Sequence, residues 1–322
     1  MLKSLGVLLN EVMDYTGLFP PDELPLAEAL ANYSRYRGES ESWMLARLLC
    51  PVTVLDQLGN FRDQCGGPQD HCRLAVRGAE HPLSPEFIKD VRAIDHFAKS
   101  HQARAAIKAL ELRLPAETIN SWSADEIGEG LNVLAGKLLE HNFSDVEVFI
   151  EPIEIDDWDM TVARVVTALQ RHDQEHGAPA PARIGFKLRT GGVEKSAYPS
   201  VAHVALAIAT CRDASIPLKF TSGLLNPIRA FDEQLQVETH GFLNVFIAGV
   251  LAHARGIDAS DLQAVLDERN VQAFEFTDHG FRWHNLEATV EEIETARREL
   301  LISFGGHCFD RVRTGLQSIG LQ

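Results

Sequence analysis

Three stretches of the sequence decide the fold: DVEVFIEP (145–152), RIGFKLRTGG (183–192) and IPLKFTSG (216–223). Each is a short apolar run typical of a buried β-strand, and the segments between them carry apolar residues at the i, i+3, i+4 spacing of helices. Strands that alternate with helices predict a parallel sheet. Five further runs of this kind raise the strand count to eight, which predicts an α/β fold closed into a (β/α)8, or TIM, barrel. The further runs occupy residues 46–51, 72–78, 109–115, 271–278 and 300–306.

The first forty residues precede the first of these strands. We expect residues 1–40 to form a helical extension that packs on the barrel, and residues 41–322 to form the barrel itself. A barrel of about 250 residues commonly folds as one unit, and no Gly- or Pro-rich linker divides the chain. An open doubly wound sheet is the alternative, but no GxGxxG or GxxxxGK[ST] fingerprint supports a nucleotide-binding version of it.

The composition limits the classes of binding partner and the cellular compartment that we expect for this protein. With 30 basic and 46 acidic residues the net charge is -16, which argues against nucleic acid and anionic membranes but permits a small anionic metabolite in a locally basic pocket. No apolar run approaches the ~18 residues of a membrane span. Five scattered cysteines without a CxxC pair, and an N-terminus without a leader pattern, predict a reduced, cytoplasmic protein. A homo-oligomer stays open. The cysteines are Cys50, Cys65, Cys72, Cys211 and Cys308.

Polar residues recur at every second position of the predicted strands. Barrel strands are covered on both faces, so a polar face inside them requires an explanation, and it is expected to point into the barrel. Buried charges persist when they are paired or when they serve chemistry, so a salt-bridge layer is the alternative to an active site. Strand ends at the carboxyl side favour chemistry. The predicted inward set is Glu111, Arg113, Glu147, Glu151, Lys187, Arg189, Lys219 and Glu275.

Two lysines near strand ends are the strongest local signal. They lie in GFKLRTGG (185–192) and LKFTSGLLNPIR (218–229). A desolvated lysine beside another cation has a depressed pKa, and its neutral amine can attack a carbonyl to form a Schiff base. These two segments resemble class I aldolases of the deoxyribose-phosphate type.

That resemblance implies a Schiff-base lysine on the sixth strand, which is counted here as Lys219. Lys187 is then the neighbouring cation, and Glu147 or Glu151 is the partner that moves protons. No metal and no organic cofactor are expected for this route. The alternative interpretation is that Lys187 and Arg189 only bind an anionic substrate, with Arg189 offering a bidentate fork.

Further candidates lie in the loops that follow the strands. His240 is expected at a helix N-terminus, where a lowered proton affinity suits an acid/base imidazole, although a capping or packing histidine is the alternative. The consecutive glycine amides at residues 305 and 306 could face a phosphate, although a plain turn is the alternative. The predicted substrate-binding residues are Arg189, Thr221, Ser222, Asn226, Gly305 and Gly306.

Over its whole length the chain resembles an uncharacterised bacterial protein family with the blocks YTGLFPP, a lysine strand followed by TAGLHHP, HGFLNVF and GSCSF. The matches here are Tyr15 to Pro21, Lys219 to Pro227, His240 to Phe246, and Gly305 to Phe309. The chain departs from these blocks in two places. Leu225 and Asn226 stand where the family has two histidines, and Gly306 and His307 replace a Ser-Cys pair.

The sequence thus favours a barrel enzyme that acts on a small anionic carbonyl compound by aldolase-type, or lyase, carbon–carbon chemistry through Lys219. One alternative is metal-assisted enolisation, with Glu151, Asp278 or His279 as ligands. Another is a catalytically inactive barrel that serves as a binding or scaffold protein, motivated by Leu225 and Asn226.

Overall fold

The computed structural model describes residues 1–58, 72–78, 84–101, 105–143, 145–153, 155–176 and 183–321. Cys65 lies outside these residues, Cys50, Cys72 and Cys211 are buried, and Cys308 is partly exposed. None of the helices within these ranges combines the length and the apolar character that a membrane crossing requires.

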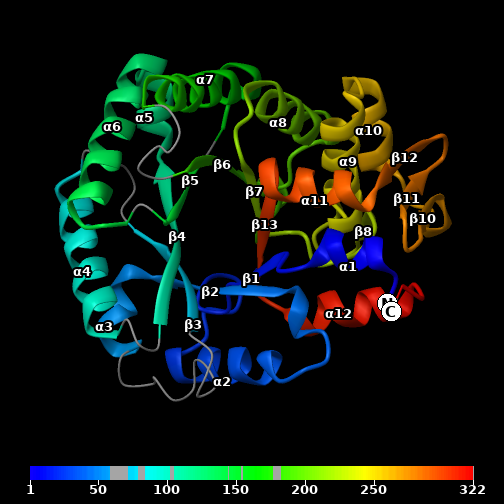
Figure 1. Ribbon diagram of the computed structural model, residues 1–322, viewed down its shortest axis with the longest axis horizontal. Helices are drawn as coiled ribbons and strands as arrows, with labels where there is room; N and C mark the ends of the chain where they lie inside the picture. Colours follow the sequence, from blue (N-terminus) through cyan, green and yellow to red (C-terminus); the bar gives the residue numbers. More distant parts are fainter. Residues whose placement is uncertain are drawn as a thin grey trace. The chain divides into compact units, whose positions relative to one another are not determined.

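Eight strands close into a parallel barrel, which confirms the predicted fold class (Figure 1). Around the barrel the order is β1-β13-β7-β6-β5-β4-β3-β2, so the strands follow one another in chain order, as (β/α)8 connections require. The barrel strands are β1 (Met13–Tyr15), β2 (Leu45–Pro51), β3 (Cys72–Arg77), β4 (Ala105–Leu114), β5 (Glu147–Pro152), β6 (Ile184–Arg189), β7 (Leu218–Thr221) and β13 (Leu301–Gly306).

One predicted barrel strand is wrong. The run 271–278 supplies β10 (Phe274–Phe276), which belongs to an antiparallel sheet with β11 (Gly280–Trp283) and β12 (Leu286–Thr289). Glu275, expected to point into the barrel, is exposed and pairs with Arg282 at 2.6 Å. The alternation that suggested a barrel strand is equally typical of an antiparallel strand with one solvated face.

The barrel strand that was missed is β1, inside the segment expected to be helical. Its three buried residues are too few to show a period of two, and the apolar residues before it belong to a helix. Counting from β1 changes the position of both lysines. Lys187 lies on β6, the sixth strand of the barrel, and Lys219 lies on β7, the seventh.

Contacts along the chain define two compact units. Unit 2 comprises residues 14–42 and 47–187. In it α4, α6 and α7 lie along the outer side of the strands from β3 to β5 (Figure 1). A capping box between Ser123 and Glu126 begins α6. The helices of this unit are α2 (Leu26–Arg37), α3 (Leu55–Leu58), α4 (Pro85–His101), α5 (Ala116–Ser121), α6 (Ala124–Glu140) and α7 (Trp158–His176).

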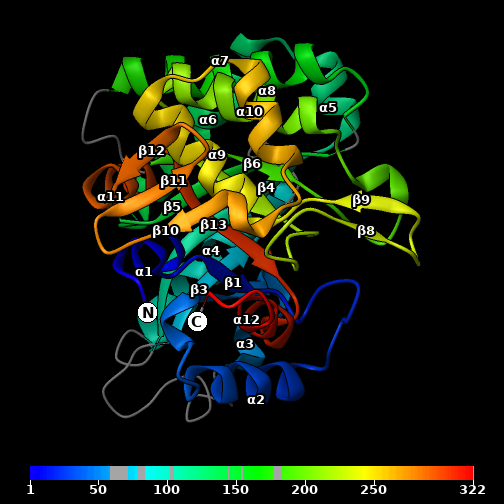
Figure 2. The same cartoon turned by 90° about the vertical axis from the view of Figure 1, so that its right-hand side faces the viewer.

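Unit 1 comprises residues 1–13, 43–46 and 188–322. Its centre is α9, which is apolar on all sides and buried along most of its length, and Gly249 lets this helix approach Leu301 of β13. The hairpin of β8 (Ala230–Asp232) and β9 (Val237–Thr239) extends away from α9 (Figure 2). The helices of this unit are α1 (Lys3–Leu9), α8 (Val201–Ala214), α9 (Phe242–Arg255), α10 (Ala259–Asp267), α11 (Val290–Glu299) and α12 (Phe309–Ser318).

Candidate active site

The inner faces of β4, β5 and β6 carry a cluster of charged side chains in unit 2. The register pairs Arg113 with Glu151, and it pairs Ile150 with Phe186, so that Lys187 falls beside Glu151 at the next position. Side chains at paired positions of a parallel sheet share one face. All three residues lie within the last three positions of their strands, the end at which barrel enzymes hold their active sites.

Lys187 is held between two buried carboxylates. Its Nζ donates to Oε2 of Glu111 at 2.6 Å and to Oε2 of Glu151 at 2.8 Å. Lys187 and Glu111 come from β6 and β4, which are separated by β5, so their side chains meet across the inner face of the sheet. Because all three side chains are buried, each charge depends on the others for its stabilisation.

Arg113 completes the group, called here the lysine cluster: Glu111, Glu151, Lys187 and Arg113. The Nε of Arg113 lies 3.9 Å from Oε2 of Glu151, too far for a hydrogen bond. Its side chain is 30% exposed, whereas that of Glu151 is 1% exposed. Two acids and two bases make the lysine cluster formally neutral, which explains how it persists inside a barrel.

A second layer of charge lies nearer the amino ends of the strands. Arg47 of β2 donates to Glu147 at 2.7 Å and lies 3.9 Å from Asp14. Burial opposes the charge of Arg47, but the carboxylates of Asp14 and Glu147 raise the pKa of its guanidinium. Glu147, predicted as a candidate to move protons, therefore lies in this layer, at the start of β5, and Glu151 lies in the lysine cluster.

Lys219 occupies β7 in unit 1, and its whole side chain is buried. The phenyl ring of the adjacent Phe220 packs against that of Phe246 on α9, with centroids 5.9 Å apart. Lys219 lies two residues before the end of β7, and its burial agrees with the inward position expected from the sequence. Its role as the nucleophile stays a prediction.

The turns that follow the strands of unit 1 bring several predicted substrate contacts together. The amide of Thr190 donates to the carbonyl of Thr221 at 2.8 Å, and the amide of Ser222 donates to the carbonyl of Gly305 at 3.1 Å. Gly223 has φ +79°, and a Cβ there would lie 2.5 Å from the Thr190 carbonyl oxygen. Backbone packing thus fixes Thr221, Ser222 and Gly305 at the carboxyl ends of β7 and β13.

Gly223→Ala is expected to lower the free energy of unfolding by about 2–4 kcal/mol, because the new methyl group meets backbone atoms in a left-handed conformation. Gly128→Ala is the matched control: a Cβ at this position of α6 meets nothing within 4 Å. The free energy of unfolding of Gly128→Ala should rise by about 0.5–1 kcal/mol, because alanine has a higher helix propensity than glycine. Urea denaturation measures both, and equal effects would contradict the packing described for the turn.

The remaining predicted substrate contacts are placed differently. Asn226 donates to Thr239 Oγ1 at 3.2 Å and accepts from Arg311 at 3.1 Å, so its side chain ties the loop between β7 and α9 to its surroundings. Gly306 is buried at the end of β13, where a Cβ would lie 2.8 Å from the Met13 side chain. Arg189 is the last residue of β6 and is partly exposed.

His240 is buried just before α9, and both of its ring nitrogens have partners. Nε2 lies 2.8 Å from the Pro199 carbonyl oxygen, so it donates, and Nδ1 accepts from Arg229 at 3.4 Å. Burial lowers the pKa of His240 to about 4. The neutral imidazole therefore joins the loop before α8 to the loop before α9, which supports the packing interpretation over acid/base work.

The stability of the protein is expected to fall as the pH falls from about 6.5 to 4 because of His240. Its pKa is about 4 when folded and about 6.5 when unfolded, so the unfolded state binds the extra proton in this window. The loss amounts to about 3 kcal/mol and is complete below pH 4. Urea midpoints across this range should show a shallower pH slope in His240→Gln. An unchanged slope would contradict a buried neutral imidazole.

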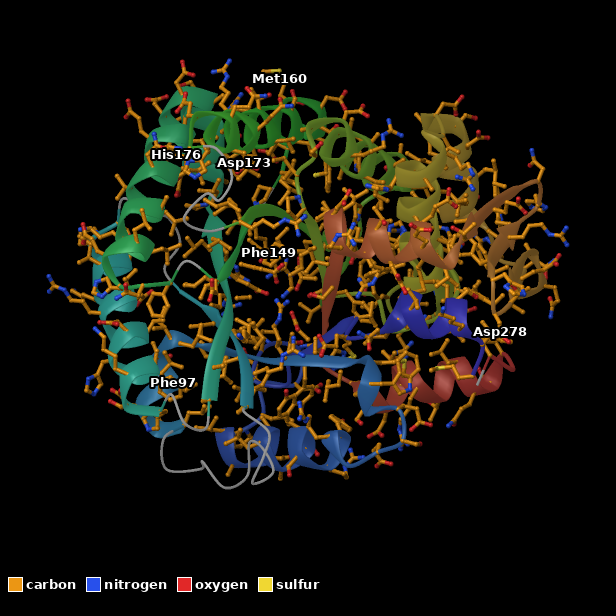
Figure 3. All side chains as sticks on the ribbon, in the orientation of Figure 1. Phe97, Phe149, Met160, Asp173, His176 and Asp278 are labelled. Atoms are coloured by element: carbon orange, nitrogen blue, oxygen red, sulfur yellow. The ribbon has the colours of Figure 1, made fainter. Side chains whose placement is uncertain are left out.

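The metal alternative gains no support from the described ranges, which hold no group of three His, Cys, Asp or Glu side chains arranged to bind a metal. Asp278 accepts from the Lys3 amide at 3.0 Å and lies with His279 on an exposed turn (Figure 3). Glu151, the third proposed metal ligand, accepts a hydrogen bond from Nζ of Lys187 at 2.8 Å.

The sequence predicted Glu111 and Arg113 as inward residues but did not select either for the site. Glu111 is in register with Phe149 on β5, and Phe149 is in register with Gly185 on β6, so Glu111 reaches across β5 to Lys187, two residues beyond Gly185. Figure 3 shows Phe149 on β5, whereas Phe97 lies in the outer helical layer on α4. The alternation along β4 contained this signal, since Glu111 and Arg113 share one face.

No protein-family model matches this chain, and no curated protein matches it.

Proposed function

We propose that this chain is a (β/α)8 enzyme in which Lys187 forms a Schiff base with a small carbonyl substrate, for aldolase-type carbon–carbon chemistry. The observation that supports this proposal is the position of the Lys187 ammonium between Glu111 and Glu151, near the carboxyl ends of three adjacent barrel strands. The closed barrel is a fold that suits enzymes in general.

The lysine cluster suits the charge of the intermediate. A lysine ammonium and a carbonyl compound combine to an iminium and water, so the positive charge at Nζ is present before and after the step. Two carboxylates within 2.8 Å of Nζ are already in place to stabilise the iminium, and they need no reorganisation. This preorganisation is the contribution that the protein makes to the reaction.

The amine must lose a proton before it attacks, and Glu151 is the group proposed to accept it. Glu151 lies one residue from the end of β5, and its Oε2 is 2.8 Å from Nζ. The proton then leaves with the carbinolamine oxygen as water. Glu111 lies deeper, where the charge of Arg47 also acts on it, so it is proposed to remain ionised as the anchor of Lys187.

The corrected strand count supports Lys187 over Lys219. The resemblance to class I aldolases implies a Schiff-base lysine on the sixth barrel strand, and that strand is β6. The sequence-based assignment to Lys219 is the competing proposal, and both are tested together.

Borohydride reduction in the presence of pyruvate or acetaldehyde tests the proposal. The wild-type protein is expected to gain the mass of one reduced adduct. Lys187→Arg, which keeps the cation but cannot form an imine, should gain none, and Lys219→Arg should behave as the wild type. An adduct that survives in Lys187→Arg and disappears in Lys219→Arg would transfer the role to Lys219. Absence of an adduct from all proteins would reject the Schiff base.

A further inference from the structure

The guanidinium of Arg113 is held only weakly by the other residues of the lysine cluster. Its Nε is buried, has no hydrogen-bond partner among the described residues, and meets Glu151 only at 3.9 Å. Arg47 in the layer below is bound to Glu147 at 2.7 Å. Nε and Nη1 of Arg47 are likewise buried without hydrogen-bond partners among the described residues, but the side chain of Arg47 is only 9% exposed. Arginine binds carboxylates through a planar pair of donors, and the side chain of Arg113, which is 30% exposed, can be reached by an anion from solvent.

The position of Arg113 relative to Lys187 limits what the anion can be. Both nitrogens approach the same atom, Oε2 of Glu151, at 2.8 Å for Nζ and 3.9 Å for Nε. A substrate whose carbonyl carbon is bonded to Nζ can therefore reach Arg113 with a group attached directly to that carbon.

We propose that Arg113 binds the carboxylate of a 2-oxo acid whose carbonyl carbon becomes bonded to Lys187. This proposal rests on the proposed function, since the iminium fixes one end of the substrate. The partly exposed side chain of Arg113 also suits the role, because the carboxylate enters from solvent and meets the arginine before it reaches the buried lysine. The carboxylate and carbonyl of one molecule then contact neighbouring groups of the lysine cluster.

Arg77 of β3 provides a matched control on the adjacent strand. The register pairs Arg77 with Glu111, so it shares the inner face with Arg113. Its guanidinium lies over the ring of Phe19, 3.9 Å from the centroid, and it is engaged there by a cation–π contact. Removing this cation alters the local charge by the same amount without removing the proposed fork.

The experiment compares borohydride trapping of the full-length protein by pyruvate and by methyl pyruvate, its uncharged ester. The wild-type protein should reach half-maximal adduct at a pyruvate concentration at least tenfold below that for the ester. Arg113→Gln should raise the value for pyruvate by 10- to 100-fold and leave the value for the ester unchanged. The half-maximal pyruvate concentration of Arg113→Lys should fall between those of the wild type and Arg113→Gln. Arg77→Gln should keep the wild-type preference for pyruvate over the ester. Circular dichroism confirms that each variant is folded.

The outcomes separate this inference from the proposed function. An adduct on Lys187 that forms equally well with acid and ester, or a preference that survives in Arg113→Gln, overturns the role of Arg113 and leaves the Schiff base intact. Loss of the preference in Arg77→Gln or Arg189→Gln, with Arg113→Gln unaffected, assigns the carboxylate elsewhere and overturns it too. Failure of both compounds to form any lysine adduct rejects the proposed function and the inference together.

Discussion

Replacing Lys187 with methionine is expected to lower the free energy of unfolding by about 3–5 kcal/mol at pH 7 and to abolish the borohydride-trapped adduct. The ammonium is the shared partner of Glu111 and Glu151, at 2.6 and 2.8 Å, and both carboxylates are buried. Without it two negative charges face each other inside the barrel. The cost comes from those abandoned carboxylates, since methionine itself packs well in an apolar setting.

Urea denaturation measures the loss, and Lys137→Met is the matched control. Lys137 pairs with Glu140 at 2.8 Å on the partly exposed surface of α6, where an ion pair contributes under about 1 kcal/mol. The triple variant that combines Lys187→Met with Glu111→Gln and Glu151→Gln should recover most of the stability, because it removes the uncompensated charges. A Lys187→Met protein as stable as Lys137→Met would show that the lysine cluster carries no charge pairing.

Glu151→Gln is expected to slow the formation of the reduced adduct by about 10²- to 10⁴-fold, the usual contribution of a general base. The amide keeps the size of the side chain but accepts no proton from Lys187. Rapid-mixing experiments with pyruvate, quenched by borohydride at successive times, give the rate for each variant.

Glu147→Gln is the control for that measurement. Glu147 lies on the same face of β5 but is bound to Arg47 in the layer below, so its loss should change the rate by less than tenfold. Equal slowing in the two variants would mean that the rate reports the total charge of the barrel interior and that Glu151 has no specific role.

Much of the fold follows from the sequence because barrel strands leave a strong pattern. Seven of the eight predicted strands lie in the barrel, and their alternation correctly grouped Glu111, Arg113, Glu151 and Lys187 on one face. The strand Met13–Tyr15 was missed because three residues cannot show a period of two. The run 271–278 was wrongly assigned to the barrel because Phe274 and Phe276 show that period in a different sheet. Alternation identifies the face of a strand and leaves its sheet unspecified.

The candidate site was less accessible to sequence reasoning because its contacts depend on register. Glu111 lies four residues and Arg113 two residues from the Pro115 that follows β4. The pairing with β5 places Arg113 opposite Glu151, and the side-chain contacts show that Glu111 binds Lys187. The packing role of His240 depends on Pro199, which lies 41 residues from it in sequence, and on Arg229, which lies 11 residues from it. Chemistry-bearing residues were therefore recognisable by type, and their partners were not.

A crystal structure of the protein trapped with pyruvate by borohydride would decide between Lys187 and Lys219. We expect electron density that continues from Nζ of Lys187 into the reduced adduct, with the adduct carboxylate on the guanidinium of Arg113 and with Glu151 beside the new carbon–nitrogen bond. Continuous density from Lys219, with Lys187 still held by Glu111 and Glu151, would contradict this expectation.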